Sequence, residues 1–168
     1  MATIKTLDDL FLHTLKDVYY AERQILKALP KMAKVAQDES LKAAFLKHRE
    51  QTQGQIERLQ QVFEALGKRA QGVTCEAING LVEECEELIE SAQGPGPVLD
   101  AGLIASAQAV EHYEMARYGT LLAWAKARGD KEVLGLIETT LAEEKETDSL
   151  LNEMANASIN PQAVKQAA

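Results

Sequence analysis

Hydrophobic residues recur along this chain at intervals of three and four, the spacing that places side chains on one face of an α-helix. Glycine and proline divide the pattern into five helical segments, predicted over residues 6–37, 38–66, 74–93, 98–128 and 130–157. Runs of β-branched residues, which favour strands, are absent from the sequence. We therefore expect an all-α protein, with a frayed tail over residues 158–168.

Local signals support the predicted helix ends. Thr6 and Asp9 form the pattern of a capping box, and Asp38 is a suitable N-cap for the second helix. Gly67 supplies a C-terminal stop for that helix. Pro30 falls inside the first segment, where we expect a kink or a local break.

The connections between segments predict the topology. The first two long helices are joined by almost no loop, as are the last two, so each pair should form an antiparallel hairpin. The chain must cross between the hairpins through the segment that holds the short helix 74–93. This is the one-crossover arrangement of a ferritin-like four-helix bundle, and we expect residues 1–168 to form one such domain. The alternative is that the short helix packs as a fifth core element.

Each long helix carries polar residues inside its apolar stripe. These are Glu22 on the first, His48 and Thr52 on the second, Glu111 and Glu114 on the fourth segment, and Glu144 and Asp148 on the fifth. Burying one ionised carboxylate costs several kcal/mol, and the stripes hold no lysine or arginine near these positions. Two bound cations would supply the missing positive charge, as in bundle cores that draw ligands from all four helices. The sequence predicts a metal site formed by Glu22, His48, Glu111, Glu114, Glu144 and Asp148.

Carboxylate oxygens with one imidazole suit iron or manganese. The chain has no Cys-x-x-Cys pair, and we expect Cys75 and Cys85 to be packing residues rather than zinc ligands. The predicted cofactor is therefore two iron ions, with manganese as the alternative. A dinuclear iron site with open positions could react with dioxygen or peroxide.

Simpler explanations exist for each residue taken alone. Glu22 could lie on the helix surface, the two acidic pairs could face solvent in part, and His48 could be a hydrogen-bonded core histidine. The neighbouring acid Glu143 is expected on a partly solvated face, and Tyr118 is expected to pack with its hydroxyl satisfied. The coincidence of inward acids on three helices with a histidine on the fourth favours the metal site.

Composition narrows the expected partners and location. A formal net charge of −8 argues against nucleic acid, which requires clustered lysine and arginine. The sequence lacks 18 consecutive apolar residues, so we expect no membrane span. The first residues lack the features of a signal peptide, and we expect a cytoplasmic protein.

A further signal comes from four segments, Leu15–Glu22, Thr52–Arg58, Val110–Glu114 and Glu143–Asp148. Together they resemble the YciE/YciF family of bacterial stress-associated proteins. The resemblance covers nearly the whole chain and implies the ferritin-like superfamily, usually a dimer, with no settled biochemical activity. Apolar residues outside the main stripes, such as Leu10, are compatible with a homodimer face or with contact to the short helix.

The chain departs from related ferritin-like sites on two helices. Such sites use Glu-x-x-His on the second helix, where this sequence offers His48, Gln51 or Gln55 as alternative ligands. Some family members carry glutamate in place of Gln51, so the second metal could bind more weakly here. Thr147 stands where the same motif on the last helix would need histidine.

Two hypotheses for function follow. In the first, a di-iron centre reacts with dioxygen or peroxide in a stress response. In the second, the protein is a non-enzymatic structural stress protein in which the metal only stabilises the bundle.

Overall fold

The computed structural model describes residues 4–166, and within that range it contains helices, turns and loops but no strand. The helices are α1 (Leu7–Val35), α2 (Glu39–Ala65), α3 (Glu76–Ser91), α4 (Pro97–Arg128), α5 (Lys131–Met154), a π-helical turn (Ala155–Ile159) and α6 (Asn160–Gln166). The all-α prediction is confirmed. None of these helices is both long and apolar enough to cross a membrane.

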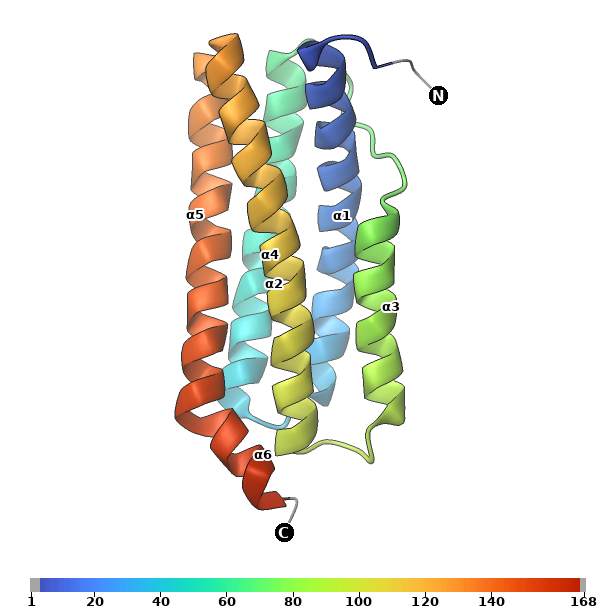
Figure 1. Ribbon diagram of the computed structural model, residues 1–168, viewed down its shortest axis with the longest axis vertical. Coiled ribbons are helices and arrows are strands. Elements are labelled where there is room, and N and C mark those ends of the chain that lie inside the picture. The colour runs from blue at the N-terminus through green and yellow to red at the C-terminus, as the bar shows by residue number, and fades with distance from the viewer. Residues whose placement is uncertain (1–3, 167–168) are drawn as a thin grey trace.

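The four long helices lie side by side (Figure 1). α1 packs along α2 and α4 packs along α5, while α2 also contacts α5 and α1 also contacts α4. The connection from α2 to α4 contains α3, which packs on the outside against α1 and α4. Ile78 and Cys85 of α3 are buried in this contact. The short helix therefore covers the edge between α1 and α4.

The predicted capping signals form the expected contacts. The Thr6 hydroxyl accepts a hydrogen bond from the Asp9 amide at 3.1 Å, and the Asp9 carboxylate accepts one from the Thr6 amide at 3.0 Å. Asp38 caps α2 by accepting from the Leu41 amide at 2.9 Å. α1 continues through Pro30 as an unbroken helix.

The C-terminal tail differs from the expectation of fraying. The chain passes from α5 through the π-helical turn into α6, which packs against α4. Leu151, Ala155 and Ile159 are all buried, so the apolar stripe of α5 continues at four-residue intervals beyond the predicted helix end. The chain stays helical through α6 to Gln166. Residues 167–168 of the predicted tail lie outside the described residues.

One carboxylate on α4 joins the two hairpins. Asp100 is 2 % exposed and accepts hydrogen bonds from the backbone amides of Gln37 and Asp38, each at 2.8 Å. These amides belong to the tight turn between α1 and α2, so the first turn of α4 fixes that turn in place.

We expect Asp100→Ala to lower the melting temperature by roughly 5 °C or more. Two backbone amides would lose a charged acceptor, at about 1–3 kcal/mol each, and 1 kcal/mol corresponds to about 2–4 °C in a domain of this size. Thermal unfolding followed by circular dichroism measures the change. Asp100→Asn, which keeps one acceptor oxygen, should lose less, and exposed Glu132→Ala serves as the control. An alanine variant that melts with the parent would show that the turn is held by other contacts.

Candidate metal centre

A polar layer crosses the middle of the four long helices, between two apolar clusters. One cluster takes its side chains from residues 11–19 of α1, 56–63 of α2, 118–125 of α4 and 133–137 of α5. The other includes Leu29, Phe45, Leu103 and Leu151 from the opposite halves of the same helices. The layer between them holds the buried polar residues Glu22, His48, Thr52, Gln55, Glu111, Glu114, Thr140, Glu144 and Thr147. Its acids are thus separated from solvent by apolar packing on both sides.

Four side chains of this layer converge on one point. His48, Glu111, Glu114 and Glu144 each offer a ligand atom, and these atoms lie within 4.8 Å of one another. His48 Nε2 lies 3.0 Å from Glu111 Oε1 and 3.8 Å from Glu144 Oε2. All four side chains are buried. The cluster takes one residue from α2, two from α4 and one from α5.

Glu22 brings a fourth carboxylate into the layer from α1. It is fully buried, and the Tyr118 hydroxyl donates a hydrogen bond to its Oε1. Burial is the main cause of the raised pKa of Glu22, and repulsion from the charge of Glu144 adds to it. The side chain thus faces the same interior as the other acids.

Several buried oxygens of these acids have no hydrogen-bond donor among the described residues. They are Glu22 Oε2, Glu111 Oε2 and both carboxylate oxygens of Glu114 and of Glu144. His48 Nε2 also lacks a hydrogen bond of good geometry. Buried polar atoms are nearly always paired in native proteins, so a concentration of unpaired acceptors at one point needs a compensating group.

Burial is the main cause of the raised pKa values in the layer. It raises the pKa of Glu22 and of Glu111 to about 8, and the neighbouring carboxylates add repulsion to both shifts. For Glu114 and Glu144, burial and repulsion from the other acids hold the pKa well above its ordinary value. Four such groups cannot all be ionised without a counter-charge, and a cation at the cluster would provide it.

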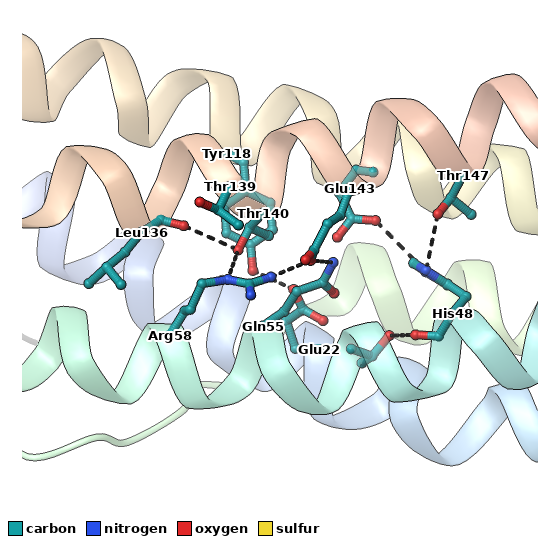
Figure 2. Close-up of polar contacts among 12 residues, drawn as sticks. Glu22, His48, Gln55, Arg58, Tyr118, Leu136, Thr139, Thr140, Glu143 and Thr147 are labelled. Atoms are coloured by element: carbon teal, nitrogen blue, oxygen red, sulfur yellow. Dashed lines mark hydrogen bonds and ion pairs between the residues drawn. The ribbon is translucent and has the colours of Figure 1, made fainter.

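The imidazole of His48 is oriented from both sides. Its Nδ1 lies 3.3 Å from the Thr147 hydroxyl, while its Nε2 faces Glu111. Figure 2 shows Thr147 of α5 pointing toward the His48 ring. The Nε2 atom is therefore the one available to the cluster.

The structure does not bring Asp148 into the cluster. Its carboxylate accepts a hydrogen bond from Gln108 Nε2 at 3.1 Å and lies 3.3 Å from His112 Nε2 at the edge of the layer. The stripe on α5 continues from Glu144 by three residues to Thr147, not by four to Asp148. In the sequence, Thr147 was noted only because it occupies the position where a Glu-x-x-His motif would have histidine. Its contact with His48 was not predicted.

A second polar group beside the cluster also escaped the sequence analysis. Arg58 forms an ion pair with Glu143 and donates from Nε to Thr140 Oγ1 at 2.9 Å, while Gln55 donates to Glu143 at 3.1 Å. Figure 2 shows Arg58, Gln55 and Glu143 grouped together between α2 and α5. Glu143 is half-buried between the two helices, which agrees with the partly solvated face expected for it, but its ion pair with Arg58 was not predicted. The i, i+3 spacing of Gln55 and Arg58, which places both side chains on one face of α2, was the sequence feature that could have indicated this group.

The sequence left His48, Gln51 and Gln55 as alternative metal ligands on α2, and the contacts of these residues favour His48. His48 faces the carboxylates directly. Gln55 is fully buried and its amide nitrogen is bonded to Glu143, while its Oε1 has no donor. Gln51 is half-buried.

Comparison with known proteins places the whole chain in one group. The model of the family described as Domain of unknown function (DUF892) matches residues 6–164. Protein YciF of Escherichia coli is 44 % identical over 165 residues, covering 98 % of this chain and 99 % of that protein.

Two solved structures have the same fold. The crystal structure of the E. coli stress protein YciF matches with a TM-score of 0.89 and 45 % identity, over 94 % of this chain and 99 % of that one. YcfI of Rhodopseudomonas palustris, described as a candidate structural protein, matches with a TM-score of 0.85 and 51 % identity, over 89 % of this chain and 94 % of that one.

Proposed function

The chain belongs to the DUF892 family, and from this premise we propose that its buried carboxylate cluster binds two iron ions within a ferritin-like four-helix bundle. Manganese is the alternative metal. The proposed ligands are Glu22, His48, Glu111, Glu114 and Glu144. Asp148 is left out of this set because Gln108 and His112 hold its carboxylate at the edge of the layer.

The observation that carries this proposal is the set of buried carboxylate oxygens without donors. Hydrogen-bonded acids would need no ion, and solvated acids would not have raised pKa values. Here both oxygens of Glu114 and of Glu144 are buried and unpaired. Oxygen-rich ligation with one imidazole, drawn from four helices, fits two hard cations and fits zinc or copper poorly.

The protein's own residues would prepare the site for such ions. Thr147 fixes the His48 ring so that Nε2 faces the cluster, and Tyr118 holds one oxygen of Glu22 so that the other stays free. The apolar clusters above and below exclude water from the layer. Two bound iron ions would supply electrons for the reduction of dioxygen or peroxide, and the name of the E. coli relative supports a role in stress.

Anaerobic titration with ferrous ion, followed by elemental analysis, tests the proposal. We expect about two iron ions per chain in the parent. Because Glu153 lies on the exposed face of α5, Glu153→Gln should bind iron as the parent does. A parent protein that retains less than one iron or manganese ion per chain after removal of free metal would contradict the proposal.

A structural role is the second candidate. The description of YcfI as a candidate structural protein favours it, and a cation held by the cluster would join α2, α4 and α5, and also α1 if Glu22 is a ligand, without any chemistry. The two candidate functions differ in whether the protein catalyses repeated oxidation of ferrous ion. Repeated oxidation of ferrous ion by added dioxygen or peroxide supports the first, whereas stoichiometric metal binding without oxidation supports the second.

The homodimer and the cytoplasmic location remain predictions. Leu10, for which a dimer face was one expectation, is half-buried within one chain, and Leu136, another apolar residue outside the main stripes, is half-buried and packs against the core. Size-exclusion chromatography with light scattering measures the oligomeric state directly, and elution at monomer size would remove the dimer from the proposal.

A further inference from the structure

A small cavity lies between α1, α3 and α4, beside the carboxylate cluster. Its volume is about 30 Å³, and its lining reaches His48 and Glu111 at the cluster. A molecule the size of water needs at least about 10–15 Å³ of such space, so the cavity has room for one diatomic molecule. The cavity is therefore a space next to the proposed ligands that none of the ligand side chains fills.

The walls of this cavity are mostly aliphatic. Ile25 and Leu29 come from α1, Val82 from α3, and Ala107 and Val110 from α4. Water in a cavity needs two to four polar partners, whereas apolar cavities stay dry and take up apolar molecules such as xenon. The composition of the walls therefore favours a small apolar occupant over water or an ion.

The polar groups along the lining do not change that preference. Burial raises the pKa of the Cys85 thiol, so this side chain stays protonated and uncharged at neutral pH, and the Ser106 hydroxyl is the other neutral polar group. His48 and Glu111 mark the inner end, where they face each other across 3.0 Å. The cavity thus runs from an apolar wall under α3 to the two ligands from α2 and α4.

We propose that this cavity is a binding site for dioxygen that opens onto the metal centre from the α3 side. Dioxygen is apolar and small enough for the volume, and it needs no hydrogen bonds from the walls. Hydrogen peroxide, which donates and accepts hydrogen bonds, fits the aliphatic walls poorly. The proposal rests on the proposed function for the centre to which the gas is delivered, but the binding site itself consists only of side chains described above.

Xenon binding to the metal-free protein tests the site without any reaction. Xenon is an apolar probe of cavities, and its NMR signal should shift with saturable dependence on parent protein concentration. Ala107→Val extends a side chain into the cavity from α4, and we expect it to weaken xenon binding at least fivefold. Ala105→Val, on the exposed face of the same helix, is the matched control and should bind xenon as the parent does. A parent without saturable xenon binding would overturn the proposal.

The rate of oxidation of the iron-loaded protein tests whether dioxygen reaches the metal centre through this cavity. We expect Ala107→Val to slow oxidation of the ferrous protein by dissolved dioxygen about tenfold, with unchanged iron content and an unchanged rate with hydrogen peroxide. Equal dioxygen rates in the parent and the variant would overturn delivery through this cavity. If Ala107→Val loses iron, the same rate measurement is made with Val82→Leu, which fills the cavity from the opposite wall. A parent that binds xenon but no iron would overturn the proposed function while supporting the gas site.

Discussion

Metal-free protein is expected to lose thermal stability as the pH rises from about 5 to about 8. Burial raises the folded-state pKa of Glu22 and of Glu111 from 4.5 to about 8. Between these two values the folded protein keeps protons that the unfolded chain has released, so each rise in pH favours unfolding. One pKa unit corresponds to about 1.4 kcal/mol, and 1 kcal/mol to about 2–4 °C here, so we expect a fall of at least about 5 °C.

Thermal unfolding in a chelator across this pH range measures the effect, and added ferrous or manganous ion should reverse its sign. Bound cations favour the ionised acids, so the stabilisation by metal should grow with pH up to neutrality. The double variant Glu22→Gln, Glu111→Gln removes two of the titrating groups and should flatten the metal-free curve. The lowered pKa of Asp9 concerns a lower pH range and does not oppose this trend. A metal-free melting temperature that rises from pH 5 to pH 8 would contradict the assignment of the acids to a buried layer.

The helices could be predicted from the sequence because their signals are local. The capping box at Thr6 and Asp9 and the N-cap at Asp38 depend on residues three apart along the chain, and each formed as expected. The end of α5 could not be placed, because the ordering of Ile159 depends on packing against other helices. Asp100 escaped notice for the same reason, since its partners at Gln37 and Asp38 lie more than 60 residues away in the sequence.

The inward acids could be predicted because they interrupt apolar stripes on their own helices. Glu22, Glu111, Glu114 and Glu144 are all buried in one layer, as the periodicity indicated. Whether they hold metal remains a prediction. The stripe on α5 was extended at the wrong interval after Glu144, because steps of three and four residues both keep a side chain near one face. Only the packing against His48 distinguishes Thr147 from Asp148.

The hydrogen-bond and ion-pair partners of the side chains in this layer could not be predicted from helical periodicity. Tyr118 and Glu22 are 96 residues apart, and Arg58 and Glu143 are 85 residues apart. The apolar stripe of a helix is a property of that helix alone, so it does not match a donor on one helix with an acceptor on another. It predicts which residues face inward, but not which of them are left unpaired, and the unpaired oxygens are what favour a metal.

The double variant Glu114→Gln, Glu144→Gln is expected to have opposite effects in the presence and absence of metal. Both carboxylates are buried, and their pKa values are held well above the ordinary range by burial and by the other acids. At neutral pH the unfolded chain ionises both groups, so keeping them protonated in the fold opposes stability. Neutral amides of nearly the same shape remove this opposition, because the unfolded chain does not ionise them.

The metal-free variant should therefore melt above the metal-free parent, by about 2–16 °C if about 1–4 kcal/mol is gained on replacing the buried acids. The stabilisation by added iron or manganese should disappear, because two of the five proposed ligands are gone. Glu146→Gln with Glu153→Gln, both on the exposed face of α5, is the matched control and should change neither property. A cluster that holds its acids through unseen hydrogen bonds would instead give a destabilised metal-free variant. Parent-like stabilisation by metal in this variant would show that the ions bind elsewhere.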